Sequence, residues 1–272
     1  METADALEEY DEERLARYHA WKRTIRAACV WSWPVCIVGF GLGFAVLAGF
    51  LPPPNENWSA QHIAHFYAQD RTAIRAGVII AMFFSALLLP FYTVISGEMR
   101  KIEGPGAMLA TIQLGGAIVL VTFFQIICLL WLEASFRPEN DPQLIRAMND
   151  YGWLVWTILI PTYSLQYVCM AIAGFMDFRK DVLWPRWACW ANLWVAFLGA
   201  GGVLAVFFKR GPFSWEGIIG IWIPVIAFGA GMTMTMVLIL ARDKRLRSAG
   251  APTTRAGATG GRPATPITAA VA

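Results

Sequence analysis

A set of polar side chains lies inside, or at the ends of, long apolar segments of the sequence. An amide or hydroxyl group without a hydrogen-bond partner in hydrocarbon costs several kcal/mol, so each of these groups needs a protein partner or a ligand. Chemistry of this kind can recognise an uncharged polar or amphiphilic molecule. The candidate binding residues are Gln113, Gln166, Asn192, Tyr163, Tyr167, Glu98 and Asp177.

Two hypotheses explain these polar residues. In the first, Gln113, Gln166 and Asn192 line a polar pocket that opens toward the cytoplasm, with Glu98 and Asp177 at its mouth. Gln166 and Asp177 are about three helical turns apart, so they share one face of a helix. In the second, the amides hold neighbouring helices together, at roughly 1 kcal/mol each. The two carboxylates then form ordinary ion pairs with the basic residues beside them.

Patterns for catalysis or metal binding are weak in this sequence. The three histidines, His19, His62 and His65, lie outside the apolar segments, which excludes haem bound between histidines of a membrane bundle. His62 and His65 have a spacing that could share a metal ion, but a solvated helix face explains them better. The five cysteines show no CxxC spacing. We therefore expect no metal, no cofactor and no catalytic residues, and an enzyme is the least favoured class.

The composition is that of a membrane protein. Of the 272 residues, 57% are hydrophobic and 15% are charged, and the mean hydropathy is +0.50. Soluble domains carry about 25% charged residues. The thirteen tryptophans favour a bilayer, because indole rings suit the interface between lipid and water. The lipid bilayer is therefore the expected partner, and the net charge of +3 does not indicate nucleic acid.

Six segments are long and apolar enough to cross a bilayer. A transmembrane helix needs about 20 apolar residues, and none of the six segments contains Asp, Glu, Lys, Arg or His. The sequence therefore predicts an all-α polytopic membrane helix bundle with six transmembrane helices over residues 28–241. The predicted spans are residues 28–51, 76–97, 108–132, 151–176, 187–208 and 217–241.

The orientation follows from the basic residues. Six spans place both termini on one side, and most of the 22 lysines and arginines fall on that side, which the positive-inside rule assigns to the cytoplasm. Residues 1–27 are predicted to form a cytoplasmic acidic amphipathic helix, which either lies along the lipid headgroups or is solvated. Residues 242–272, rich in Ala, Pro, Thr and Gly toward the end, are predicted to be a disordered cytoplasmic tail.

Prolines and capping residues predict where helices start and break. Ser59 is a candidate cap for a short helix in the first outer loop, and Asp141 followed by Pro142 is one in the second. Both short helices are predicted to run on into the next span. Proline inside a span kinks or interrupts the helix. Each even-numbered span contains one, at Pro90, Pro161 and Pro224.

Two short patterns carry a resemblance. The first is Pro185-Arg186-Trp187 with Asn192, or PRWxxxxN, and the second is Gly211-Pro212-Phe213 with Trp215 and Gly217, or GPFxWxG. On these patterns, the chain resembles small six-span integral membrane proteins of bacteria that have no known activity. The resemblance implies six spans and a place in the cytoplasmic (inner) membrane. It implies no substrate, cofactor or catalytic residue.

Two hypotheses of function follow from the sequence. The first is that the bundle binds a small lipophilic or uncharged molecule or facilitates its passage. Its spans lack the ionisable residue that proton coupling needs. The second is a non-catalytic accessory or assembly subunit, whose aromatic surface contacts other membrane proteins. Inward-facing tryptophans around a cavity with Gln166 favour the first hypothesis, and outward-facing ones on a single flank favour the second. The tryptophans expected to line a binding site are Trp153, Trp156, Trp190, Trp194 and Trp222.

Overall fold

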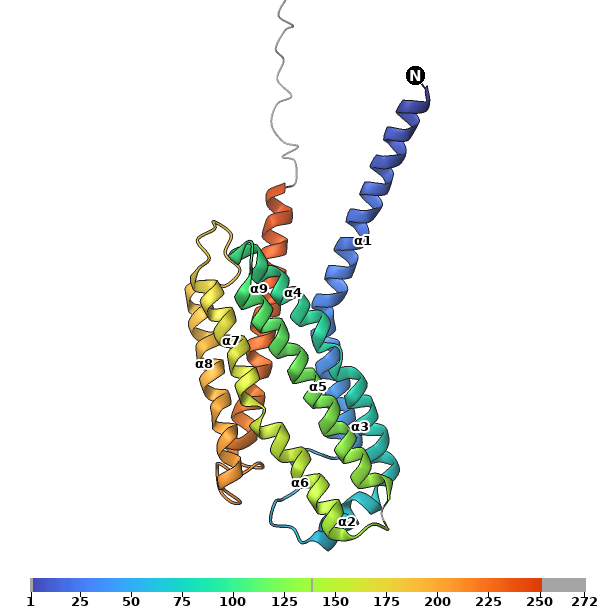
Figure 1. The fold of residues 1–272 in the computed structure, drawn as a ribbon, viewed down its shortest axis with the longest axis vertical. Helices are drawn as coiled ribbons and strands as arrows, with labels where there is room; N and C mark the ends of the chain where they lie inside the picture. Colours follow the sequence, from blue (N-terminus) through green and yellow to red (C-terminus); the bar gives the residue numbers. More distant parts are fainter. Residues whose placement is uncertain (1, 138, 251–272) are drawn as a thin grey trace, which may run out of the picture.

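The fold is a bundle of helices that is elongated along one axis (Figure 1). The computed structural model describes residues 2–137 and 139–250, with side chains from residue 11 to residue 248, and this part of the chain contains no strand. The helices are α1 (Glu2–Gly41), η1 (Leu42–Leu47), α2 (Ala60–Gln69), α3 (Arg71–Ser85), α4 (Leu88–Glu103), α5 (Met108–Phe136), α6 (Pro142–Ile158), α7 (Ile160–Phe175), α8 (Arg186–Gly199), η2 (Ala200–Phe207), η3 (Ile218–Trp222) and α9 (Ile223–Gly250).

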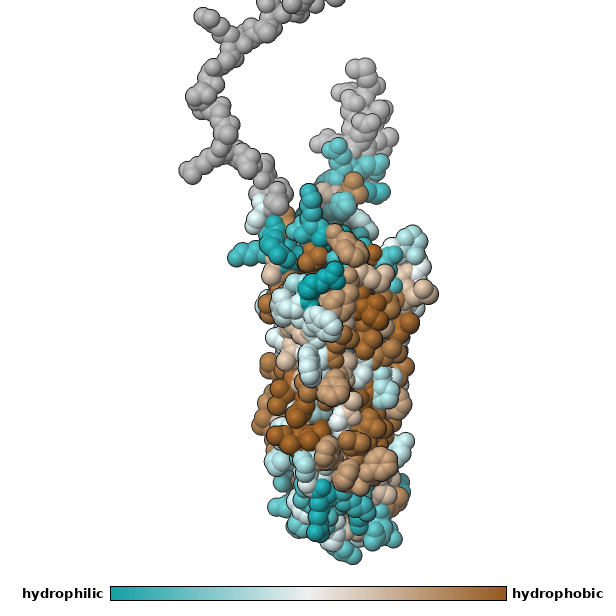
Figure 2. Space-filling view, turned by 90° about the vertical axis from the view of Figure 1, so that its left-hand side faces the viewer, coloured by the Kyte–Doolittle hydropathy of each residue, from teal (hydrophilic) through white to brown (hydrophobic). Residues whose placement is uncertain are grey.

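The six predicted spans are confirmed as helices long and apolar enough to cross a membrane. Figure 2 shows a broad hydrophobic band between two hydrophilic ends, as expected for a protein surrounded by lipid at its middle. The spans extend beyond the apolar segments, because several helices continue into their polar flanks. They are Asp11–Leu47, Arg71–Glu103, Met108–Phe136, Pro142–Phe175, Arg186–Phe207 and Ile218–Ser248.

Both ends of the described chain lie at the same end of the bundle (Figure 1), hereafter the terminal end. The beginning of α1 projects beyond the bundle as a single helix, and Tyr18 and Trp21 on it are exposed. The predicted N-terminal helix is therefore a direct continuation of the first span. At the other terminus, α9 runs to Gly250, so residues 242–250 are helical. The rest of the predicted tail, residues 251–272, lies outside the described residues.

The prolines of the even-numbered spans interrupt their helices, as predicted. In the second span α3 gives way to α4 just before Pro90, and in the fourth α6 gives way to α7 just before Pro161. In the sixth, η3 gives way to α9 just before Pro224. Proline has no N–H to donate, and its ring clashes with the carbonyl one turn earlier, so it is tolerated best in the first turn of a helix. Pro34 of the first span differs, because it lies inside the continuous helix α1.

The predicted caps of the two short helices at the other end of the bundle are confirmed. The Ser59 hydroxyl accepts a hydrogen bond from the His62 N–H at 3.2 Å, and the Asp141 carboxylate accepts one from the Gln143 N–H at 2.9 Å. The helix that starts after Asp141 runs on into the fourth span, as predicted. The helix that starts after Ser59 differs, because a break at Asp70 separates α2 from α3.

Aromatic rings fill the bundle near the end opposite the termini. Five of them form what we call the aromatic core: Phe44, Phe50, Trp131, Trp153 and Trp156. The ring of Trp131 lies 4.9 Å from that of Phe50 and 5.1 Å from that of Trp153, measured between centroids. These separations are in the range where aromatic pairs stabilise each other beyond their buried area. These rings therefore form a tightly packed core at this end of the bundle.

Candidate functional site: an apolar cavity at the helix breaks

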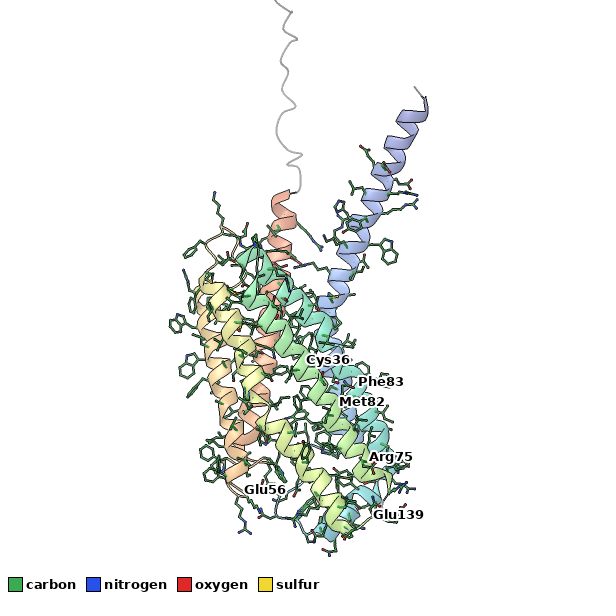
Figure 3. The ribbon with its side chains drawn as sticks, in the orientation of Figure 1. Cys36, Glu56, Arg75, Met82, Phe83 and Glu139 are labelled. Carbon is green, nitrogen blue, oxygen red and sulfur yellow. The ribbon has the colours of Figure 1, made fainter. Side chains whose placement is uncertain are left out.

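A cavity of about 170 Å³ lies inside the bundle, and its wall is almost entirely apolar. Among the described residues that line it, none is charged. Cys36, labelled in Figure 3, belongs to this wall and is buried at the middle of the bundle. The aromatic side chains of the wall are Trp33, Phe40, Phe124, Trp156, Tyr163 and Phe228.

The cavity lies at the level of the three helix breaks. Leu88 lies at the first break, Leu159 at the second and Pro224 at the third, and all three residues line the cavity. A helix that stops and restarts changes direction, so its side chains no longer interlock with those of its neighbours at that level. The prolines therefore explain why space remains here, although the surrounding residues are large and apolar.

At two of the breaks, side chains donate hydrogen bonds to backbone carbonyl groups near the break. The Met82 carbonyl, at the end of α3, accepts hydrogen bonds from Gln125 Nε2 at 3.0 Å and from Ser85 Oγ at 2.7 Å. The Leu159 carbonyl, between α6 and α7, accepts one from Thr162 Oγ1 at 3.1 Å. An unpaired carbonyl would make the cavity attractive to water or to a polar ligand. Because these carbonyls are paired, the wall keeps its apolar character.

The cavity reaches the outer surface of the bundle between α1 and α9. Ile37 of α1 and Val225 of α9 both line it, yet they are 45% and 41% exposed. Both side chains lie in the apolar band of the protein, where the surrounding solvent is lipid. A molecule dissolved in the bilayer can therefore approach the cavity from the side.

Three of the predicted binding residues lie on α7, and one of them lines the cavity. Tyr163 is part of the wall, and its hydroxyl donates to the Val195 carbonyl at 3.2 Å. The Tyr167 hydroxyl donates to the Phe228 carbonyl at 3.0 Å, which ties α7 to α9. Gln166 Nε2 donates to the carbonyl one turn earlier in its own helix at 3.1 Å. The buried Gln166 Oε1 has no hydrogen-bond partner among the described residues.

Gln113 and Asn192 are fully buried, and they lie outside the wall of the apolar cavity. Within the described chain, neither amide has a hydrogen-bond partner for its side-chain oxygen or nitrogen. Gln113 is one turn from Gly116, which packs against the side chain of Gln166. Asn192 shares a face of α8 with Cys189, which packs against α7. The predicted polar pocket and the apolar cavity are therefore different places, and the polar pocket stays a prediction.

Glu98 holds three helices together at the terminal end. It is only 2% exposed, and its Oε1 accepts hydrogen bonds from Arg26 of α1 at 2.9 Å and from Lys101 at 2.6 Å. Its Oε2 accepts one from Arg242 of α9 at 2.7 Å. We call this group the Glu98 clamp. It makes the kind of ion pair that the second hypothesis predicts for this carboxylate.

Asp177, in the loop after α7, forms a two-pronged ion pair with Arg179. Its two oxygens accept from the Arg179 side chain at 2.8 and 2.7 Å. Burial disfavours the charged carboxylate, but the guanidinium group outweighs burial and lowers the pKa of Asp177 below its ordinary value. Both carboxylates predicted at the mouth of a pocket are therefore occupied by basic side chains.

The tryptophans divide into inward-facing and outward-facing sets. Trp153 is buried in the aromatic core, and Trp156 also lines the cavity. Trp190 and Trp194 of α8 point outward, with exposed fractions of 59% and 61%. Trp33 lines the cavity and was missed by sequence reasoning, although its spacing to Phe40, two helical turns, places both on one face of α1.

The described residues contain no group of three or more His, Cys, Asp or Glu side chains that could hold a metal ion. His62 instead packs against Trp58, with 4.1 Å between ring centroids. The five cysteines are free thiols, and four of them are buried.

The first sequence pattern lies at the start of the fifth span, and the second lies in the loop just before the sixth. Pro185 precedes the first residue of α8, and Trp215, in the loop before η3, donates from its indole N–H to the Pro54 carbonyl at 2.9 Å. Comparison of the chain with protein-family models, with curated proteins and with solved structures found no match. The function therefore has to be inferred from the chemistry of the cavity.

Proposed function

We propose that this integral membrane protein binds a small lipophilic or uncharged molecule in the cavity at the helix breaks, and that it passes this molecule to or from the bilayer. The observation that carries the proposal is an apolar cavity of about 170 Å³ inside the apolar band. An apolar cavity of about 150 Å³ is large enough to bind benzene or xenon. A ligand with one or two small rings, or a short branched hydrocarbon, fits this volume.

The wall of the cavity supports an apolar ligand rather than a polar one. The Tyr163 hydroxyl is used by the Val195 carbonyl, and the Ser85 hydroxyl is used by the Met82 carbonyl. Polar groups already bonded to protein gain little from a ligand. The rings of the wall offer dispersion contacts to hydrocarbon instead. Access between Ile37 and Val225 allows exchange with the lipid phase.

Filling the cavity tests the proposal. A side chain added at Gly229, which lines the cavity on α9, meets no atom within 4 Å of its Cβ. Gly229→Leu therefore adds a leucine at the wall of the cavity, at a position where its Cβ has open space. Gly115→Leu is the matched control, because Gly115 also has open space around its Cβ but faces outward from α5.

The experiment is purification of each variant from its native membrane in mild detergent, followed by solvent extraction and mass spectrometry. We expect a lipophilic molecule at a near-equimolar amount in the wild type and in Gly115→Leu, and at least a tenfold reduction in Gly229→Leu. An unchanged amount in Gly229→Leu would contradict the proposal. The absence of any stoichiometric small molecule from the wild type would contradict it as well.

One observation favours the accessory-subunit function as a second candidate. Aromatic side chains form a stripe along the outer face of α8, with exposed fractions from 59% to 68%: Trp187, Trp190, Trp194 and Phe197. Bulky aromatic residues are enriched at the centres of protein–protein interfaces. The same purification tests this function. A protein that copurifies in stoichiometric amount with the wild type, and is lost from Trp190→Ala/Trp194→Ala, would make this function primary.

A further inference from the structure

A second cavity lies between α1 and α9 at the terminal end of the bundle, and we call it the basic pocket. Its volume is about 410 Å³. Four basic side chains line it, two from each helix: Arg23, Arg26, Lys244 and Arg247. Asp243 is the only acidic residue among the described residues of its wall. Since α1 and α9 are far apart in sequence, the fold brings these charges together.

Three of the four basic side chains of the basic pocket have no acidic partner among the described residues. Arg26 is paired with Asp243 and with Glu98. Arg23, Lys244 and Arg247 form no ion pair within the part of the chain that the structure describes. Lys244 and Arg247 also lie one turn apart on the same helix, where like charges destabilise each other. A bound anion would remove this repulsion and supply the missing partner.

Apolar side chains form the part of the basic pocket that faces the membrane. They are Ala27, Val30 and Trp31 from α1 and Leu240 from α9. Val30 is buried, whereas the indole of Trp31 is half exposed toward the lipid. Arg23 and Val30 are about 10 Å apart along the helix axis, so the wall changes from basic to apolar over about the length of a lipid headgroup. An amphiphile can contact both the basic and the apolar side chains of this wall, whereas a small soluble anion can contact only the basic ones.

The Glu98 clamp keeps the basic pocket open before any ligand binds. Arg26 of α1 and Arg242 of α9 both bond to Glu98, so α4 fixes the separation of the two helices that form the pocket. Preformed sites lose less entropy on binding than sites that have to be assembled. Arg17 of α1, by contrast, lies outside the basic pocket and is paired with Glu13 on an exposed helix surface.

From these observations we infer that the basic pocket binds the phosphate headgroup of an anionic phospholipid from the adjoining leaflet. Arg23, Lys244 and Arg247 contact the phosphate, and Val30, Trp31 and Leu240 contact the start of an acyl chain. Basic pockets between transmembrane helices are known to hold anionic headgroups in this way. The inference goes beyond the proposed function and does not depend on it. The two cavities are separate, because a hydrogen bond of 3.1 Å between Trp33 Nε1 and Thr233 Oγ1 joins α1 and α9 between them.

The test is native mass spectrometry of the full chain, delipidated in mild detergent and titrated with phosphatidylglycerol or phosphatidylcholine. The pocket variant is Arg23→Gln/Arg247→Gln. Its matched control is Arg17→Gln/Arg245→Gln, which removes the same number of charges from the same two helices outside the pocket. We expect phosphatidylglycerol to bind the wild type and the control at least tenfold more tightly than the pocket variant. Phosphatidylcholine should bind all three weakly.

A competition experiment distinguishes a lipid site from a site for a soluble anion. Inorganic phosphate at millimolar concentration should not displace phosphatidylglycerol. Displacement would show a site for a soluble phosphate compound and overturn the inference, as would equal losses in the two double variants or equal binding of the two lipids. Arg247→Gln alone, at an exposed position near the end of α9, should still weaken binding several-fold if the double variant misfolds. The lipophilic molecule in the apolar cavity should stay bound in every variant, which distinguishes this test from that of the proposed function.

Discussion

The aromatic core and the region between α1 and α9, here called the seam, differ in packing: rings pack against one another in the first, whereas the apolar cavity and the basic pocket adjoin the second. In the aromatic core, glycine allows close packing. A Cβ on Gly152 would lie 2.5 Å from Trp131 Nε1, so the indole occupies the space that a side chain would need. Along the seam, the helices are joined at separated points, by Trp33 and Thr233 and by Arg26 and Asp243. The apolar cavity and the basic pocket lie on either side of the Trp33 contact.

This difference teaches that large aromatic residues do not by themselves fill a bundle. Where glycine allows rings to interlock, the rings exclude space. Where the helices break at prolines, rings of the same size enclose a cavity. In our proposals, the aromatic core therefore supplies stability, and the two cavities along the seam supply the sites for ligands.

The largest effect is expected in the aromatic core. Trp131→Ala should lower the free energy of unfolding by about 3–5 kcal/mol, because it deletes a fully buried indole and leaves a void. Trp187→Ala, at an exposed position of α8, is the control and should change stability by less than about 0.5 kcal/mol. Thermal unfolding of both variants in mild detergent checks this. Similar losses in the two variants would mean that the aromatic core is not the stable region.

The next effect concerns the Glu98 clamp. Glu98→Gln should lower the free energy of unfolding by about 1.5–3 kcal/mol, because a buried carboxylate that bonds to three cations is lost. It should also weaken the binding of phosphatidylglycerol, since the clamp positions both walls of the basic pocket. Denaturant unfolding and native mass spectrometry measure the two effects. Glu13→Gln, in an exposed pair with Arg17, should change neither by a measurable amount.

A smaller effect is expected at Asn192. The structure gives this buried amide no hydrogen-bond partner within the described residues, so Asn192→Leu should raise the free energy of unfolding by about 1 kcal/mol. Chemical denaturation in detergent measures the change. A loss of stability would instead reveal a bound partner for the amide. That result would favour the predicted polar pocket with Gln113 and Gln166.

The smallest effect concerns the pH dependence of stability at a loop, at the end of the bundle that holds the aromatic core. Glu56, labelled in Figure 3, is buried, and its carboxylate accepts a hydrogen bond from the Trp215 N–H at 3.3 Å. Burial raises the pKa of Glu56 above its ordinary value of 4.5, and the nearby Glu216 and Asp150 raise it further, against the bonds from Ser214 and Trp215.

A raised carboxyl pKa means that protonation of Glu56 favours the folded state. Its stabilisation is fully present below pH 4.5 and is lost as the pH rises through the folded-state pKa. Glu56→Gln should therefore gain in melting temperature relative to the wild type between pH 4.5 and 7. Melting curves of both proteins across this range measure the difference. Parallel pH profiles would show that Glu56 does not titrate differently in the folded protein.

The features predicted from the sequence are those fixed by local residues. The length of an apolar segment determines a span, proline marks the breaks of the even-numbered spans, and Ser59 and Asp141 cap the helices that follow them. Proline alone does not determine a break, because α1 continues through Pro34. The cavity could not be predicted in this way. Its wall combines residues from elements far apart in sequence, such as Trp33 and Phe228, and such residues cannot be distinguished from ordinary core residues before the fold is known.

The buried polar residues could be identified from the sequence, but their role could not. An amide within an apolar segment is conspicuous in a sequence, whether it binds a ligand or holds two helices together. Gln125 illustrates the second role, because it pairs with groups at the first helix break. Of the predicted binding residues, only Tyr163 lines the apolar cavity.

The most direct test of the central claim is photolabelling in membranes with a small apolar diazirine, followed by mapping of the labelled residues by mass spectrometry. We predict saturable labelling of cavity residues such as Trp156 and Phe228, which disappears in Gly229→Leu and persists in Gly115→Leu. Labelling confined to outward-facing residues such as Val38 and Phe83, and equal in both variants, would contradict the claim that the helix breaks hold a binding cavity.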